Sequence, residues 1–438
     1  MTTFDVKRRR ETLRAAAVAI LPEDCPDEVL DAVVADFIEE IGLQSQTMQD
    51  QFGGFVDALD KAVAVALLGG RFSGLRSMSR REVERVFVSM ATHPVPQLRA
   101  GFNALRRAIS FIAYGRSDEK GNPLWARIEY PGPRDDRPRD AGAELPITAL
   151  QDAPDEVDVI VVGSGAGGSV AAAVLAQAGR RVLVVEEGEY FPARRVEQRE
   201  LEGFRHLFLD RGGTSTSDLG IGILAGRGVG GGTVINWNVS LRLSGEVAAD
   251  WDRASGLRGL AASLAPHYDA VSQRLGLAPS PDNANNQALR AGCEALGWDV
   301  KAIPRNASGC GAGCGYCTFG CAYGKKRDTP RTFLKDAVAA GAQVVASARV
   351  ARVLLEGQDD RRRVAGVEIA LEHGGTRRIR SKLVVVAGGS LRTPQILHRS
   401  GIRARALGRH LHLHPATSTN GVFDHPIEPW IGAPMSAV

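Results

Sequence analysis

Residues 159–188, VIVVGSGAGGSVAAAVLAQAGRRVLVVEEG, decide the fold of this chain. The four apolar residues that open the stretch are typical of a parallel strand buried on both faces. Gly163, Gly165 and Gly168 then form the pattern G-x-G-x-x-G. The first glycine permits a tight turn, the second leaves room for a pyrophosphate, and the third lets the next helix pack against the strand. Residues 169–178 predict that helix, whose free N–H groups would face the phosphates.

A second predicted strand, 181–185, ends at Glu186. An acid at this place in a dinucleotide-binding fold accepts hydrogen bonds from ribose hydroxyls. A carboxylate there disfavours a 2′-phosphate, so NADP is the least favoured dinucleotide, and NAD and FAD remain open. Glycine-rich loops also arise by chance, but strand, turn, helix, strand and acid occur here in the order that the fold requires. The predicted contacts are Gly163, Ser164, Gly165, Ala166, Gly167, Gly168 and Glu186.

The composition is that of a globular protein with room for two to three domains. The 438 residues include 54 Lys and Arg against 50 Asp and Glu, a formal net charge of +4. The basic residues are spread along the chain, so nucleic-acid binding is not indicated. Mean hydropathy is −0.11, and apolar runs such as 62–68 are far too short to span a bilayer. We expect no transmembrane segment and leave peripheral membrane association open.

A basic run near the N-terminus, KRRR at 7–10, is compatible with a twin-arginine export signal. The apolar run behind it, 15–21, is short and is followed by Pro22 and two acidic residues. This pattern favours an amphipathic helix with a solvated basic end. We therefore expect a cytoplasmic protein and treat export as the weaker alternative.

Two further stretches decide which dinucleotide binds. GRGVGGGTVINW at 226–237 is dense in glycine, which lets the backbone pass close to a flat or charged ligand. GGSLRTPQILHRSGI at 388–402 follows an apolar strand and opens a helix. Together they resemble the two signatures of the glucose–methanol–choline (GMC) family of FAD-dependent oxidoreductases. The matching positions are Arg227, Gly230, Gly231, Thr233 and Asn236 in the first stretch and Ser390, Thr393, Pro394, Ser400 and Gly401 in the second, with Arg403 where the family usually has glycine.

By this resemblance the dinucleotide is FAD. ASARVARVLLE at 346–356 looks like the family strand whose backbone, at Val350, meets the adenine. LGRHLHLHP at 407–415 resembles the family's G-x-x-L-x-D-H-P, with His412 where Asp is usual and His414 at the His. The further FAD contacts that the resemblance implies are Arg227, Gly230, Gly231, Thr233, Asn236, Val350, Ala387 and Gly388.

The resemblance begins near residue 157, and the segments before it carry apolar residues at helical spacing. The implied class is α/β, with a GMC-type Rossmann-like FAD-binding domain, an α-helical domain before it and an incomplete substrate domain. The predicted parts are an α-helical N-terminal domain (1–115), a linker or wrapping segment (116–156), a first part of the FAD domain (157–245), an inserted or cap region with a cysteine cluster (246–335), a second part of the FAD domain (336–415) and the start of a substrate-binding domain (416–438).

Within the family the chain looks most like the long-chain alcohol oxidases and their bacterial relatives. The helical extension, the Cys-rich stretch 310–326 and the HLHLHP segment carry this likeness. It implies an enzyme that passes a hydride from an alcohol, a long-chain aliphatic one, to FAD and yields an aldehyde or ketone. Oxygen or another electron acceptor would then reoxidise the flavin. Two alternatives remain: a sugar, polyol or sterol dehydrogenase of the same family, and a non-catalytic flavin-binding or electron-transfer subunit.

Cys310, Cys314, Cys317 and Cys321 have the spacing C-x3-C-x2-C-x3-C. The ferredoxin run C-x2-C-x2-C-x3-C is the nearest pattern, so an iron–sulfur cluster is one interpretation. Zinc is a second and less favoured one, because four ligands in one short loop are tight for a tetrahedral site. The third is a Gly- and Cys-rich loop with free thiols or a local disulfide.

Three histidines alternate near the end of the chain, at His410, His412 and His414. On a strand all three would face one side, where they could bind zinc or copper. The likeness of this stretch to a structural segment of the family weighs against a metal site.

The family takes the hydroxyl proton with a His close to the C-terminus, beside a second His or Asn. The stretch 428–438, EPWIGAPMSAV, contains no such pair. The sequence therefore predicts a base beyond Val438, in a longer protein of which this is the N-terminal portion, and the chain alone can lack turnover. Asn236 is the best candidate for a group near the reacting face of the flavin, with backbone hydrogen bonding in a turn as the alternative.

Overall fold

The computed structural model describes residues 7–117, 121–133, 140, 142, 144–217, 220–256, 258–310, 314–358, 361–414, 416 and 419–438. Contacts within the chain divide it into two compact units. The helical unit comprises Met1–Pro133, Arg199–Arg205 and Leu209–Leu224. The sheet unit comprises Arg134–Gln198, His206–Phe208 and Ala225–Val438.

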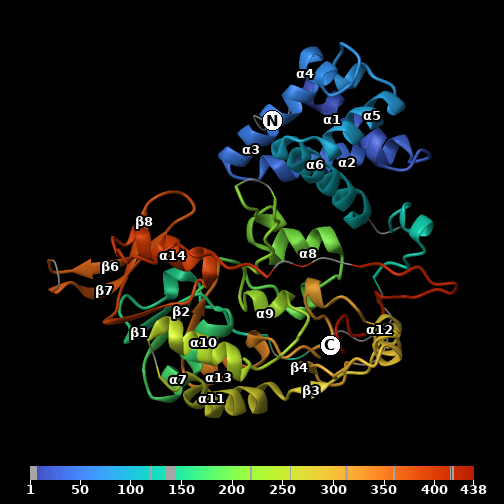
Figure 1. The fold of residues 1–438 in the computed structure, drawn as a ribbon. Coiled ribbons are helices and arrows are strands. Elements are labelled where there is room, and N and C mark those ends of the chain that lie inside the picture. The colour runs from blue at the N-terminus through green and yellow to red at the C-terminus, as the bar shows by residue number, and fades with distance from the viewer. Residues whose placement is uncertain are drawn as a thin grey trace. The chain divides into compact units, whose positions relative to one another are not determined.

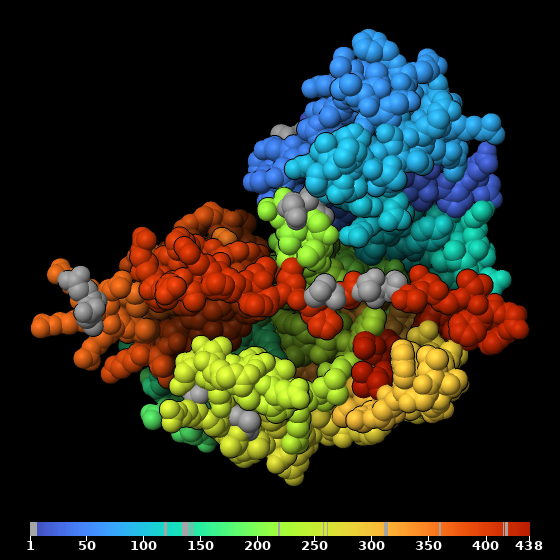
Figure 2. Space-filling view, in the orientation of Figure 1, coloured from blue at the N-terminus to red at the C-terminus, as the bar shows by residue number. Residues whose placement is uncertain are grey.

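Helices α1 to α6 form most of the helical unit and are drawn in blue and cyan in Figure 1. Their apolar residues recur three or four positions apart, as Val83, Val86 and Met90 do in α5, and are buried in one core. Ser79 and Glu82 form a capping box that begins α5. Side chains cover this core with a continuous surface in Figure 2. The bounds are α1 (Lys7–Ile20), α2 (Asp27–Gly42), α3 (Gln46–Leu59), α4 (Ala62–Leu67), α5 (Arg80–Thr92) and α6 (Pro96–Gly115).

A four-stranded parallel sheet is the centre of the sheet unit. Its strand order is β5-β2-β1-β9, with β1 (Val159–Val162), β2 (Val182–Val185), β5 (Gln343–Val345) and β9 (Leu383–Val386). Strand β1 pairs with β2 on one side and β9 on the other, and its four residues are all buried. The predicted strand buried on both faces is therefore present.

The side chains of β1 alternate between two hydrophobic cores. Val159 and Val161 pack with helices α7 (Ala166–Gln177) and α13 (Phe333–Ala339). Ile160 and Val162 pack with residues of a second sheet. That sheet is antiparallel, with the order β6-β7-β8, and consists of β6 (Arg349–Glu356), β7 (Arg363–Ala370) and β8 (Thr376–Arg380). The parallel sheet is thus a layer between helices and another sheet.

The other helices and strands complete the two units. They are α8 (Glu200–Leu207), α9 (Gly232–Ile235), α10 (Gly245–Ser255), α11 (Leu260–Leu275), α12 (Ala284–Ala295), α14 (Gly389–Arg399) and the pair β3 (Ala278–Pro279) and β4 (Pro304–Arg305). No helix of the described residues is long and apolar enough to cross a membrane.

The predicted fold class is confirmed, since a helical N-terminal part precedes a mixed α/β part with a parallel sheet. The boundaries predicted between the parts stay predictions. The strand on which His410, His412 and His414 would face one side is absent: these residues form no strand, and His410 has a φ of 60°. Alternation of side chains is not sufficient for a strand, which also needs a neighbouring strand to pair with.

Candidate functional site

The loops that follow β1 and β9 meet at one edge of the parallel sheet. All parallel strands end at the same edge, where open α/β folds bind ligands. Gly163 follows β1 with a φ of 99°, and its N–H donates to the carbonyl of Val185 (2.9 Å). Ala387 follows β9 and donates its N–H to the carbonyl of Val162 (2.8 Å). A Cβ on Gly163 would lie 2.5 Å from the Ala387 oxygen, so this position requires glycine.

Helix α7 begins at this edge without a side-chain cap. Gly165 is its N-cap residue, so the N–H groups of the first turn have no side-chain partner. A Cβ on Gly168 would lie 2.0 Å from the oxygen of Gly163, whereas a Cβ on Gly165 would meet no atom within 4 Å. Open space beside an uncapped helix N-terminus is what a dinucleotide pyrophosphate requires, so these residues fit such a group.

The Glu186 carboxylate is buried and organises the loop after β1. One oxygen accepts hydrogen bonds from the N–H (2.9 Å) and the hydroxyl (2.7 Å) of Ser164, and the other accepts one from the N–H of Gly188 (3.0 Å). Burial raises the pKa of Glu186 above that of a solvated glutamate. The carboxylate keeps lone pairs for further donors, so the contact with ribose stays a prediction.

Ser164 joins the two glycine-rich loops, which lie 66 residues apart in the sequence. Its hydroxyl donates to Glu186 and accepts a hydrogen bond from the N–H of Gly230 (3.0 Å). The backbones approach closely here, because a Cβ on Gly231 would lie 3.1 Å from the Cα of Gly165. The structure therefore brings together the two loops that the sequence predicts for one ligand.

Two other predicted contacts lie where strands begin or end. Val350 is buried in β6, two residues after Ala348, whose N–H donates to the carbonyl of Glu186 (2.8 Å). Gly388 is the N-cap residue of α14, directly after the loop residue that contacts β1. Both positions adjoin the edge of the sheet, and their contacts with a ligand stay predictions.

Three predicted residues lie in or near the short helix α9. The hydroxyl of Thr233 donates to the carbonyl of Gly230 (2.7 Å), and the backbone N–H of Arg227 donates to a carbonyl of α8 (2.8 Å). Asn236 follows α9 and is exposed, and its Oδ1 accepts a hydrogen bond from the N–H of Asn238 at 3.4 Å. The turn hydrogen bond proposed as the alternative for Asn236 is present, and its exposed amide leaves the flavin contact open.

The sequence analysis missed Thr329, which supports both loops. Its hydroxyl donates to the carbonyl of Ser164 (3.2 Å), and its N–H donates to the hydroxyl of Thr233 (3.2 Å). Pro330 follows it, which is typical of the first turn of a helix and predicts only that local structure. The bonds to residues 165 and 96 positions away follow from the tertiary fold.

Lys326 was missed as well, and it is almost wholly buried at 2% exposure. Its ammonium donates to the carbonyls of Val234 (2.6 Å), Asn236 (2.6 Å) and Cys317 (3.0 Å). Burial lowers the pKa of Lys326 to about 8. The adjacent Lys325 is exposed, and nothing in the sequence tells which of the two lysines is buried.

The four clustered cysteines are free thiols, and Cys317 is the most buried of them. Burial raises the pKa of Cys310 to about 11. Four N–H groups of the described residues donate to their sulfurs: Gln198 Nε2 to Cys314 (3.6 Å), Asn238 Nδ2 (3.6 Å) and Arg305 Nη2 (3.8 Å) to Cys317, and Lys326 N to Cys321 (3.4 Å).

Metal binding is not supported by the geometry of these side chains. Among the residues that the structure describes, which leave out 311–313 of the cysteine loop, no three His, Cys, Asp or Glu side chains are arranged to hold a metal ion. This holds for the described histidines His410, His412 and His414 as for the cysteines. Iron–sulfur or zinc binding by the cysteines stays a prediction.

A parallel α/β sheet with a glycine-rich helix N-terminus at its carboxyl edge defines a dinucleotide-binding protein. A family model described as GMC oxidoreductase matches residues 157–416, and the chain belongs to this family.

The chain is similar to the long-chain-alcohol oxidases FAO1 and FAO3 of Arabidopsis thaliana. FAO1 is 34% identical over 374 residues, which cover 75% of this chain and 49% of that protein. FAO3 is 32% identical over 398 residues, which cover 81% of this chain and 52% of that protein. The chain therefore spans about half the length of these relatives. Among solved structures, pyridoxine 4-oxidase from Mesorbium loti matches with a TM-score of 0.43 and 22% identity, over 56% of this chain and 52% of that one.

Substitution of Gly165 by Ala tests the place of the pyrophosphate. The added methyl group meets no protein atom, so we expect unchanged thermal stability and at least tenfold weaker dinucleotide binding, measured by flavin fluorescence. Gly245→Ala is the matched control, because it adds the same methyl group in open space at the start of α10. Equal binding by both variants would place the pyrophosphate elsewhere.

Substitution of Lys326 by Met tests the buried ammonium. Three carbonyls lose their donor, and an unsatisfied buried polar group costs about 1–3 kcal/mol. We expect a lower free energy of unfolding in urea and weaker flavin binding, because the backbone of α9 loses the hydrogen bonds that hold it to residue 326. Lys325→Met changes an exposed neighbour and should alter neither. Unchanged stability of the Lys326 variant would show that the ammonium does not hold this loop.

Proposed function

We propose that the sheet unit binds FAD at the carboxyl edge of its parallel sheet, and that the whole protein uses FAD to oxidise an alcohol to an aldehyde or ketone. The observation that carries the proposal is the contact of Ser164 with Glu186 and Gly230, which joins two loops around the open space at Gly165. Membership of the GMC family and similarity to long-chain-alcohol oxidases support the choice of FAD and of an alcohol.

Bound FAD would accept a hydride from the carbinol carbon of the alcohol. The uncapped N–H groups of α7 would bind the pyrophosphate, Glu186 the ribose hydroxyls, and the backbone at Val350 the adenine. The exposed amide of Asn236 would lie near the reacting face of the flavin, where it can orient the substrate oxygen by a hydrogen bond. The base that takes the hydroxyl proton is proposed to lie beyond Val438.

A long-chain aliphatic alcohol is the proposed substrate. Oxygen or another electron acceptor is the proposed second substrate, which reoxidises the flavin. The names of the relatives support the alkyl chain, and a sugar, polyol or sterol is the alternative. A cytoplasmic location, free or at a membrane surface, is part of the proposal, and the free thiols of all six cysteines agree with a reducing compartment.

The purified chain tests the cofactor directly. We expect a two-band flavin absorption spectrum and release of one FAD per chain on denaturation, because the residues proposed to contact FAD all lie in the sheet unit. The measurement is visible absorption followed by chromatography of the released nucleotide. A folded, colourless chain that does not take up added FAD would refute the proposed site.

The whole protein tests the substrate. If the alkyl chain is buried on binding, kcat/KM should rise about threefold to fourfold for each added CH2 from 1-hexanol to 1-dodecanol, since each buried CH2 contributes about 0.8 kcal/mol. Steady-state rates with an artificial acceptor measure this series, with glucose and cholesterol as comparison substrates. A flat series, or faster oxidation of glucose or cholesterol, would assign the enzyme to the alternative substrate class.

A second candidate function is electron transfer through the cysteine loop. Arg305 and Lys326 are buried at 0% and 2% exposure. Neither is ion-paired with a carboxylate in the described part of the chain, and Arg305 Nη2 lies 3.8 Å from the sulfur of Cys317. Buried cations favour a nearby anion, and thiolates that hold an iron–sulfur cluster would be that anion.

Metal analysis of anaerobically purified whole protein tests the cysteine loop. A cluster predicts iron and acid-labile sulfide in equal amounts, both lost in Cys317→Ser and kept in Cys293→Ser, which changes a cysteine of α12 outside the loop. Zinc without sulfide would indicate a structural zinc site. Metal-free protein with reactive thiols at these positions would exclude both.

A further inference from the structure

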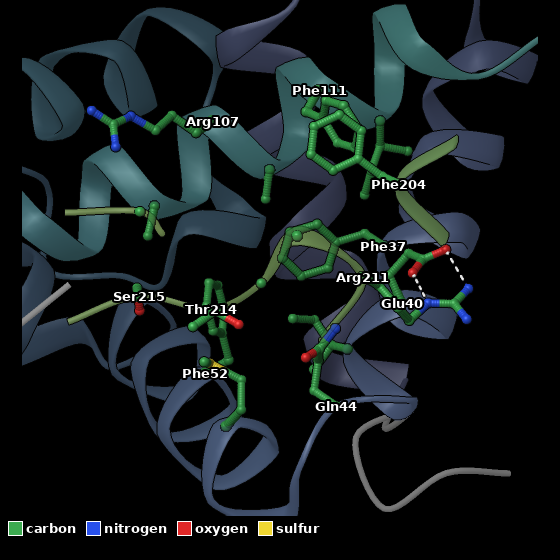
Figure 3. A pocket seen from close by; sticks show the side chains of 18 of the residues that line it. Phe37, Glu40, Gln44, Phe52, Arg107, Phe111, Phe204, Arg211, Thr214 and Ser215 are labelled. Carbon is green, nitrogen blue, oxygen red and sulfur yellow. Dashed lines mark hydrogen bonds and ion pairs between the residues drawn. The ribbon is translucent and has the colours of Figure 1, made fainter. Parts of the chain in front are cut away.

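The helical unit contains a cavity of about 280 Å³. Its walls come from α2, α3 and α6, from the first turns of α8 and from residues 211–215 and 222, all of which belong to this unit. The apolar lining includes Phe37, Ile41, Phe52, Phe111, Ile112 and Phe204, and Figure 3 shows several of these rings around the hollow. The size lies just below the usual range for small-molecule pockets, about 300–1,000 Å³.

The backbone at Asp210 and Arg211, where the cavity wall of residues 211–215 begins, is held in a strained shape. Asp210 and Arg211 are adjacent non-glycine residues with φ of 46° and 55°. Arg211 donates two hydrogen bonds to Glu40 of α2 (2.7 and 3.1 Å), and the Gln44 amide donates to the carbonyl of Asp210 (3.2 Å); Figure 3 draws the contact of Arg211 with Glu40. Strained backbone held by specific contacts is typical of ligand-binding walls.

The charges at the cavity are mostly positive. Arg107, Arg205 and Arg211 line it, against the single carboxylate of Glu40. Burial acts to raise the pKa of Glu40, but hydrogen bonds from Arg211 and Arg205 outweigh it and hold the pKa below the ordinary value. Glu40 is therefore ionised and shared by two guanidinium groups.

The side chain of Arg107 has no hydrogen bond or ion pair with any residue described in the structure, and it is exposed. Arg107 is one of the residues that line the cavity, and in Figure 3 its side chain extends outward from α6, away from the rings. An apolar hollow with an unused guanidinium at its rim matches a ligand that has an alkyl tail and a negatively charged head.

We infer that this cavity binds one aliphatic chain that ends in a carboxylate, as in a free fatty acid. The chain occupies the apolar hollow, where Ala104 and Ala108 of α6 leave room and Met48 adapts to its shape. The head accepts hydrogen bonds from Arg107. None of the residues proposed to contact the dinucleotide lines this cavity. The inference is therefore independent of the proposed function.

Calorimetric titration of the whole protein with dodecanoate, below the concentration at which it forms micelles, tests the inference. We expect one site per chain, about tenfold weaker binding in Arg107→Gln, and no binding in Ala108→Leu, whose added atoms fill the hollow. Arg106→Gln is the matched control, because Arg106 is an exposed neighbour that does not line the cavity. It should bind as the unaltered protein does.

Four results would overturn the inference. They are the absence of binding, equal losses in the Arg106 and Arg107 variants, unchanged binding in a folded Ala108→Leu variant, and 1-dodecanol binding as tightly as dodecanoate. Vesicles of phosphatidylglycerol distinguish a lipid surface from a free fatty acid. Vesicle binding that depends on Arg107 and is not displaced by dodecanoate would assign the site to a membrane lipid instead. Flavin absorbance recorded in the same titration should stay constant.

Discussion

The hydroxyl of Ser164 makes the interaction on which the proposed dinucleotide site depends. It donates to Glu186 at the end of β2 and accepts from Gly230 in the second glycine-rich loop. The carbonyl of the same residue accepts from Thr329. A hydroxyl can donate and accept at once, so the Ser164 side chain connects the end of β2 with the second glycine-rich loop, and its backbone carbonyl adds the segment at Thr329. Removal of the donor would leave a buried carboxylate with one partner fewer, which is costly in a low-dielectric setting.

The buried ammonium of Lys326 extends this arrangement to the cysteine loop. It donates to the carbonyl of Val234 in α9, to that of Asn236 directly after α9, and to that of Cys317. Carbonyl dipoles compensate only part of a buried charge, and the lowered pKa of Lys326 expresses the remaining penalty. The fold tolerates this penalty at the place where two loops must keep one geometry, as expected of a preorganised site.

Local patterns predicted what depends on a few neighbouring residues. The strand, the turn and the helix at residues 159–188 follow from an apolar run and three glycines, and the structure confirms them. The assembly of the helical unit from Met1–Pro133 with Arg199–Arg205 and Leu209–Leu224 was not predictable in this way. The joining contacts, such as Glu40 with Arg205 and Arg211, link residues 165 and 171 positions apart. Their partners are common charged residues without a local signal.

The path of the chain explains how the cavity and the dinucleotide site can act separately. Residues 209–224, which supply part of the cavity wall, leave the sheet unit after Phe208 and return to it before Gly226. These two residues form an antiparallel bridge, and the N–H of Arg227 bonds the carbonyl of Leu207 beside it (2.8 Å). Residues 209–224 therefore form a loop whose two ends are joined by this bridge, directly before the second glycine-rich loop. A ligand that changes the conformation of residues 209–224 would change a loop whose two ends are joined. The hydrogen bonds of Ser164 and Lys326 hold the second glycine-rich loop independently of residues 209–224.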